Sequence, residues 1–157
     1  MAQREWPGDS GEMTEKLVQL GTPGAYVPSA DDPPYLRLGG PEGVRALAEA
    51  FYDAMEQHEL ALTAVHQLDA PGKISRTSRE HFGTFLVFWL GGPQDYLQTR
   101  GHPRLRMRHM QVAVTEAMRD AWLRSMQLAM NARGVEGPLR MFLDGRFAEV
   151  AEFLRNA

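Results

Sequence analysis

Apolar residues recur at intervals of three and four along most of the chain, the spacing that lines one face of an α-helix. No segment shows the convincing alternation of apolar and polar residues that a half-buried strand requires. We therefore expect an all-α fold. The predicted helices cover 43–57, 60–65, a segment that starts at 75–78 and stops at 91–93, 103–110, 115–134 and 138–154.

Residues typical of helix ends bound these segments. Ser75, Thr77 or Ser78 is expected to cap the second long helix, and the Gly-Gly-Pro turn at 91–93 to stop it. Thr115, followed by an acidic residue, is expected to cap the next long helix.

The first 34 residues have a different character from the rest of the 157-residue chain. Four of the ten prolines fall within 21–34, which predicts an extended or flexible N-terminal arm over 1–34 and a globular domain over 35–157. The polar N-terminus lacks the apolar core of a secretory signal, and the longest apolar run, 85–90, is too short to cross a membrane. We expect a cytoplasmic protein with no membrane partner.

Several kinds of chemistry are excluded or disfavoured by composition. The chain has no Cys, which rules out disulfides, thiolate metal sites, iron–sulfur clusters and Cys catalysis. A net charge of −3 gives no overall attraction to nucleic acid. Phosphate-binding, zinc-protease and serine-hydrolase motifs are missing from the sequence. Glu49 and Glu56, seven residues apart, are interpreted as part of a solvated helix face.

The most informative segment is Arg100-Gly-His-Pro-Arg-Leu-Arg-Met-Arg-His109, which holds no acidic residue. Such a string is compatible with a basic patch for phosphate or RNA. Pro103 instead favours a helix start, which places Leu105 and His109 on one face. His109 on an apolar face is compatible with a core histidine or with an axial haem ligand. In the second case the Leu105 carbonyl would accept the Nδ1 proton, and Arg108 would meet a haem propionate.

The sequence resembles a known family, the truncated haemoglobins of group II. The resemblance covers about residues 36–155 and follows the family's order and spacing of motifs. These motifs are Phe51-Tyr52, Trp89-Leu-Gly-Gly-Pro93, Tyr96, the string that ends in His109, and Arg119-Asp-Ala-Trp122.

The resemblance implies a two-over-two helical sandwich around haem b (iron protoporphyrin IX), with His109 as the proximal iron ligand. Tyr52 and Trp122 match the family's distal tyrosine and tryptophan, whose O–H and N–H groups donate hydrogen bonds. Dioxygen gains partial negative charge on haem iron, so such donors slow its release. The implied cofactor-binding set is completed by Leu105, Arg108, Phe82 and Tyr96.

Two further distal positions follow from the same resemblance. His66 matches a third distal position, although a slip of one residue in the preceding loop would put Val65 there instead. Ser78 matches the position at which ordinary globins carry a distal histidine. A distal His66 would tune ligand binding through its ionisation near neutral pH.

The expected function is a haem protein that reversibly binds dioxygen and related diatomic ligands, in the broad class of oxygen-binding and oxygen-transport proteins. Slow release would suit ligand scavenging or redox chemistry better than bulk oxygen delivery. The alternative is a haem enzyme with peroxidase-like or nitric-oxide dioxygenase activity. The chain carries no flavin or nicotinamide module, so turnover would need an external reductase or electron donor. The arm is expected to be disordered, to cover the haem entrance, or to assist contact in a homodimer, and the sequence leaves these three alternatives open.

Overall fold

The computed structural model describes residues 24–93 and 113–157. Its two β-strands, β1 (Leu68–Ala70) and β2 (Lys73–Ile74), form a small antiparallel hairpin. Every other regular element in these ranges is a helix. The helices are α2 (Pro34–Arg37), α3 (Gly40–His58), α4 (Leu60–Ala64), α5 (Arg76–Trp89), α8 (Glu116–Ala132) and α9 (Gly137–Leu154).

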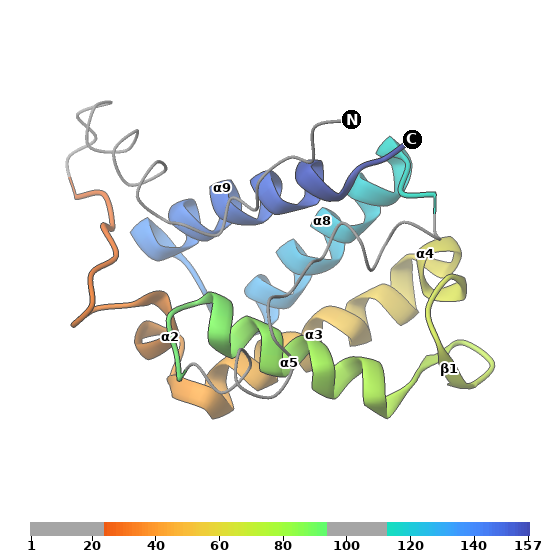
Figure 1. Cartoon of the computed structure of the whole chain (residues 1–157), viewed down its shortest axis with the longest axis horizontal. Coiled ribbons are helices and arrows are strands. Elements are labelled where there is room, and N and C mark those ends of the chain that lie inside the picture. Colours follow the sequence, from red (N-terminus) through yellow and green to blue (C-terminus); the bar gives the residue numbers. More distant parts are fainter. Residues whose placement is uncertain (1–23, 94–112) are drawn as a thin grey trace.

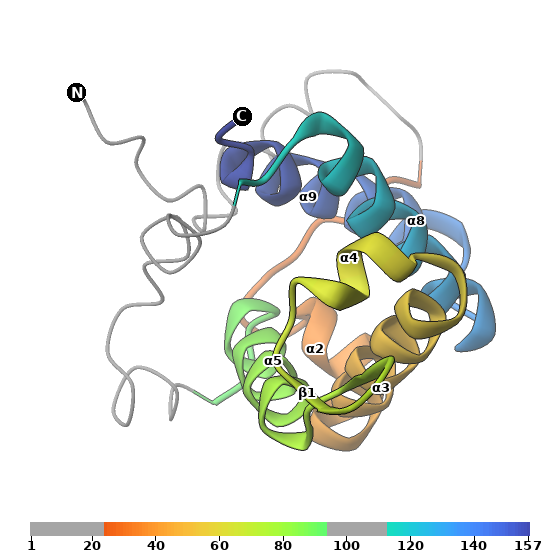
Figure 2. The ribbon, with the colours of Figure 1, turned by 90° about the vertical axis from the view of Figure 1, so that its right-hand side faces the viewer.

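The long helices form two pairs, one above the other. Helices α3 and α5 make the lower pair, and α8 and α9 make the upper pair (Figures 1 and 2). Helix α3 packs against both α5 and α8, so it joins the two layers. The short helix α4 follows α3 and also contacts α8. This arrangement confirms the expected two-over-two sandwich.

Within the described residues, the predicted helix boundaries agree with the structure to within about three residues, and the predicted helix over 103–110 lies outside the described residues. The Ser75 side chain accepts a hydrogen bond from the Ser78 backbone N–H at 3.0 Å, so Ser75 is the cap among the three candidates. Thr115 caps α8 in the same way, accepting from the Met118 N–H at 3.1 Å. After α5 the chain turns at Gly91, whose φ of 93° is in the left-handed region that favours glycine.

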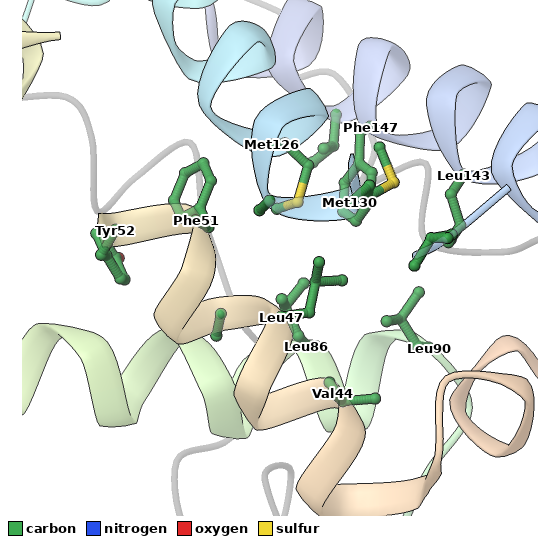
Figure 3. Packing of buried hydrophobic residues seen from close by; sticks show 14 of the residues in the cluster. Val44, Leu47, Phe51, Tyr52, Leu86, Leu90, Met126, Met130, Leu143 and Phe147 are labelled. Carbon is green, nitrogen blue, oxygen red and sulfur yellow. The ribbon is translucent and has the colours of Figure 1, made fainter. Parts of the chain in front are cut away.

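The core lies between the two layers and consists of the apolar stripes identified in the sequence. Figure 3 shows Leu47 and Phe51 of α3 directed toward Met126, Met130 and Phe147 of the upper pair. These five side chains are almost completely buried. Burial of Leu47 and Phe51 sets which face of α3 turns to the core, and thereby the side of the helix from which the neighbouring Tyr52 side chain projects.

Two features were not expected from the sequence. The hairpin occupies the segment around 71–72, where only a chain break was expected, and the Ile74 N–H donates to Glu56 Oε2 at 2.8 Å. Part of the predicted arm also packs on the domain. Tyr26 is buried, lies edge-on to Phe142 at 5.2 Å between ring centroids, and donates to the Asp32 carbonyl at 2.6 Å.

Within 24–93 and 113–157, no helix is both long enough and apolar enough to cross a membrane.

Candidate functional site

A cavity of about 430 Å³ opens between the two helix layers. Its wall is built by α3, α4, α5, α8 and α9, and it is mostly aromatic and aliphatic with a few polar groups. This size and lining are typical of sites for a small molecule or cofactor. The lining includes Tyr52, Leu62, Val65, His66, Ser78, Phe82, Phe85, Met118, Arg119, Trp122, Phe147, Val150 and Leu154.

Tyr52 is a buried polar residue in this wall, with 6% of its surface exposed. It leaves α3 on a different side from its neighbour Phe51, which enters the core (Figure 3). Burial raises the pKa of the Tyr52 hydroxyl above its ordinary value, and the charge of Arg79 acts in the opposite direction. The hydroxyl therefore stays protonated across the neutral range and is available as a hydrogen-bond donor.

The His66 ring lies edge-on to Tyr52, with 5.7 Å between the ring centroids and 82° between the planes. Its Nδ1 atom is 2.8 Å from the backbone oxygen of Leu62, one helical turn earlier. A carbonyl oxygen only accepts, so Nδ1 carries the proton. Val65 also lines the cavity, but 46% of its surface is exposed and the ring contact with Tyr52 belongs to His66.

Phe82 and Trp122 connect the two layers beside the cavity. The Phe82 ring packs on Phe51 at 4.9 Å and on Tyr52 at 5.6 Å between centroids. The Trp122 ring lies 5.1 Å from Phe51, 6.3 Å from Phe82 and 5.8 Å from Phe147. Such offset and edge-on pairs favour one relative orientation of the rings. The indole of Trp122 and the phenol of Tyr52 are thus held by shared neighbours.

Ser78 stands at the first turn of α5 and completes this side of the wall. Its hydroxyl accepts a hydrogen bond from the Ser75 hydroxyl at 3.0 Å, while Ser75 in turn caps the helix. A serine hydroxyl that accepts in this way keeps its own proton for a second bond.

The structure thus brings together five of the residues predicted for the site, namely Tyr52, His66, Ser78, Phe82 and Trp122. The other four lie outside the described residues: Tyr96, Leu105, Arg108 and His109. The described chain resumes at 113, and Val114 lines the cavity.

The sequence interpretation missed several cavity residues. Met118, one turn before Trp122, and Leu154, at the end of α9, belong to predicted apolar stripes but were not assigned to a site. Arg119 was quoted only as part of a motif, and in the structure it lines the cavity while its guanidinium binds Glu152 at 2.5 Å. His81 is exposed at the rim of the same cavity.

The interpretation of Glu49 and Glu56 as a solvated face holds for Glu49, whose side chain is 36% exposed, and is wrong for Glu56. Both carboxylates bind the guanidinium of Arg79 on α5, at 2.7 and 2.8 Å. The Glu56 side chain is only 12% exposed. Asp53, between them on the same helix face, binds Arg79 at 2.9 Å.

Comparison with known proteins gives one consistent result. The family model described as bacterial-like globin matches residues 34–156. The group 2 truncated hemoglobin YjbI of Bacillus subtilis strain 168 is 36% identical over 123 residues, which cover 78% of this chain and 88% of the relative.

Solved structures show the same likeness. The cold-adapted truncated hemoglobin of the Antarctic bacterium Pseudoalteromonas haloplanktis TAC125 superposes with a TM-score of 0.72 at 35% identity, covering 80% of this chain and 98% of the other. A truncated oxygen-avid haemoglobin from Bacillus subtilis gives a TM-score of 0.70 at 34% identity, covering 79% and 99%.

Proposed function

Since the chain belongs to the truncated haemoglobins of group II, within the bacterial-like globins, we propose that it binds haem b and reversibly binds dioxygen and related diatomic ligands. The observation that carries the proposal is the convergence of Tyr52, His66 and Trp122 on one largely apolar cavity. An apolar slot suits the macrocycle of haem, and a small set of donors suits a polarised ligand.

Five residues of the chain are proposed to hold the haem. His109 is the proposed iron ligand, with the Leu105 carbonyl as acceptor for its Nδ1 proton and Arg108 as a propionate partner. Tyr96 and Phe82 are the proposed apolar contacts. Haem iron supplies the coordination position at which a diatomic ligand binds and gains partial negative charge.

The distal donors account for retention of the ligand. The buried hydroxyl of Tyr52 and the indole N–H of Trp122 are proposed to donate hydrogen bonds to it. Because water is largely excluded from such a site, each bond contributes more than it would in solution. His66 and Ser78 are proposed as further polar neighbours. Slow release fits ligand scavenging or redox chemistry better than bulk oxygen transport.

A second candidate function is supported by the hydrogen bond between His66 and Leu62. With the proton on Nδ1, the neutral ring presents Nε2 as a base. A base beside the ligand position would accept a proton from hydrogen peroxide, as a peroxidase-like activity requires. This activity, like consumption of nitric oxide, needs an external reductase or electron donor. The proposed setting for both functions is the cytoplasm.

Haem titration of the purified chain tests the first proposal. We expect a Soret band that saturates at one haem per chain and that is lost or displaced in His109→Ala. His58→Ala, which changes an exposed histidine at the end of α3, is the matched control and is expected to leave the band unchanged. A chain that stays colourless, or a band that survives in His109→Ala, would contradict the assignment. Sedimentation of the loaded protein, with and without residues 1–23 of the predicted arm over 1–34, tests whether the arm assists contact in a homodimer.

A further inference from the structure

Three residues with carboxylate side chains lie close to Tyr52 along helix α3. They are Glu49, Asp53 and Glu56, at positions −3, +1 and +4 relative to Tyr52. Positions 49, 53 and 56 follow one another at intervals of four and three, so they share one helix face adjoining Tyr52. Their common partner is Arg79, which comes from the neighbouring helix α5.

Arg79 forms three ion pairs with α3. Its side chain is 10% exposed, and its two terminal nitrogens are divided between Glu49 and Asp53 on one side and Glu56 on the other. Burial alone would lower the pKa of Arg79, but the hydrogen bonds that Arg79 donates to Asp53 and Glu56, together with the attraction of these two carboxylates, raise it overall. The planar guanidinium is therefore fixed in position by atoms of α3 itself.

The same guanidinium lies over the ring of Tyr52, with Cζ 5.7 Å from the ring centroid. This distance is within the range of a cation–π interaction. Three other aromatic rings pack on Tyr52, those of Phe51, Phe82 and His66. Arg79 is thus the charged member of the group that encloses the phenol.

We propose that Arg79 is a positioning residue for the Tyr52 hydroxyl, holding the ring in the orientation in which it donates to the bound ligand. The inference rests on the proposed function, because it assumes that Tyr52 is a donor. The arrangement works as a clamp: α3 supplies both the phenol and the three carboxylates, and Arg79 links them from α5. Arg79 also follows Ser78 directly, and Ser78 lines the cavity.

The clamp has an electrostatic effect as well as a steric one. The positive charge of Arg79 lowers the pKa of the Tyr52 hydroxyl against the effect of burial. A more acidic phenol is a stronger hydrogen-bond donor. Removing the charge should therefore weaken the donor and release the ring at the same time.

A mutant cycle on the haem-loaded protein separates this role from general stabilisation. The variants are Arg79→Met and Arg79→Lys, each made alone and in the Tyr52→Phe background. Arg140→Met is the matched control, because Arg140 is a partly buried arginine of α9 with partners Asp144 and Asn131, and it is absent from the cavity wall. The measurements are the dioxygen dissociation rate and the C–O stretching frequency of the carbon monoxide complex.

We expect Arg79→Met to speed dioxygen release about three- to tenfold, the effect of losing one hydrogen bond. In the Tyr52→Phe background the same change should alter the rate less than about twofold. The C–O frequency should rise toward the Tyr52→Phe value, since a donor beside the ligand oxygen lowers it. The dissociation rate and C–O frequency of Arg79→Lys should lie between those of Arg79→Met and the parent protein. If Arg79→Met takes up no haem, Arg79→Lys is compared with the parent in its place. Arg140→Met should change neither measurement.

Three other results of the mutant cycle would overturn part of this picture. If Tyr52→Phe alone leaves the dissociation rate and the C–O frequency unchanged, Tyr52 is no donor and that part of the proposed function fails. If Tyr52→Phe changes them while the Arg79 variants match Arg140→Met, only the positioning role is overturned. An Arg79 effect of equal size in both backgrounds also overturns it, because the effect would then not pass through Tyr52.

Discussion

The Nδ1 atom of His66 donates a hydrogen bond to the backbone oxygen of Leu62 over 2.8 Å. Because the acceptor is a carbonyl, this bond selects the tautomer of the neutral ring and leaves Nε2 without a proton. A neutral His66 therefore accepts hydrogen bonds at Nε2 and donates none there. A neutral imidazole can in general either donate or accept at Nε2, and the bond to Leu62 removes the first option for His66.

For the neutral ring, this tautomer predicts a small effect of His66→Phe on dioxygen release. The substitution keeps an aromatic ring against Tyr52 and removes an acceptor, so the dissociation rate should change less than about threefold, below the effect of losing a donor. Flash photolysis or stopped-flow displacement measures the rate. A His66→Phe effect as large as that of Tyr52→Phe would contradict the prediction, and a nitrogen-15 spectrum with the proton on Nε2 would explain why.

Trp122→Phe should behave differently. It removes the indole N–H while keeping an aromatic ring against Phe51 and Phe147. Loss of a donor to the ligand should raise the dioxygen dissociation rate about three- to tenfold. The double variant with Tyr52→Phe should be faster than either single variant. An unchanged rate in Trp122→Phe would remove Trp122 from the proposed donor set.

Capping of α5 by Ser75 is expected to matter more for stability than capping of α8 by Thr115. The Ser75 side chain bonds both the N–H and the hydroxyl of Ser78, and Ser75 is buried. Ser75→Ala should lower the free energy of unfolding by about 1–2 kcal/mol, and Thr115→Ala by about 1 kcal/mol. Urea unfolding measures both. Ser29→Ala, on an exposed loop, is the control with little expected change. Equal values for Ser75→Ala and Ser29→Ala would show that the cap contributes nothing.

The sequence was sufficient for those parts of the fold that depend on local pattern. Apolar spacing located α3, α5, α8 and α9. Hydroxyl residues located the starts of α5 and α8, and the Gly-Gly-Pro turn located the end of α5, because both signals arise within a few residues. The Arg79 cluster could not be predicted in this way. Its partners lie 23 to 30 residues away on another helix, and single-sequence spacing does not state which helix faces meet.

The site was predictable only through the resemblance. Tyr52, Phe82 and Trp122 taken singly have the spacing of ordinary core aromatics, and the structure does place them in contact with core rings. Tyr26 is a buried residue that the sequence pattern did not predict. It lies among prolines and small residues that predict an arm, yet a single aromatic ring finds a place against Phe142. One buried ring leaves no periodicity from which its burial can be read.

The pair between Glu59 and Arg124 gives a pH-dependent prediction. Arg124 on α8 binds both carboxylate oxygens of Glu59, at 2.7 and 3.1 Å, and Glu59 links the end of α3 to the start of α4. The hydrogen bonds from Arg124 hold the pKa of Glu59 below its ordinary value of 4.5. A carboxylate whose pKa is lowered by folding stabilises the protein at pH values above its unfolded pKa, and this contribution is lost as the pH falls through the folded value.

Glu59→Gln should therefore lower the free energy of unfolding at pH 7 by about 0.5–1 kcal/mol, the usual size for a pair with one exposed partner. The difference from the parent protein should shrink as the pH drops below 4.5, because the parent then loses the same charge. Urea unfolding of both proteins at a series of pH values measures this difference. Glu136→Gln, which changes an exposed carboxylate before α9, is expected to leave stability nearly unchanged throughout. A Glu59→Gln difference that stays constant from pH 7 to the acid limit would mean that Glu59 contributes through packing and not through its charge.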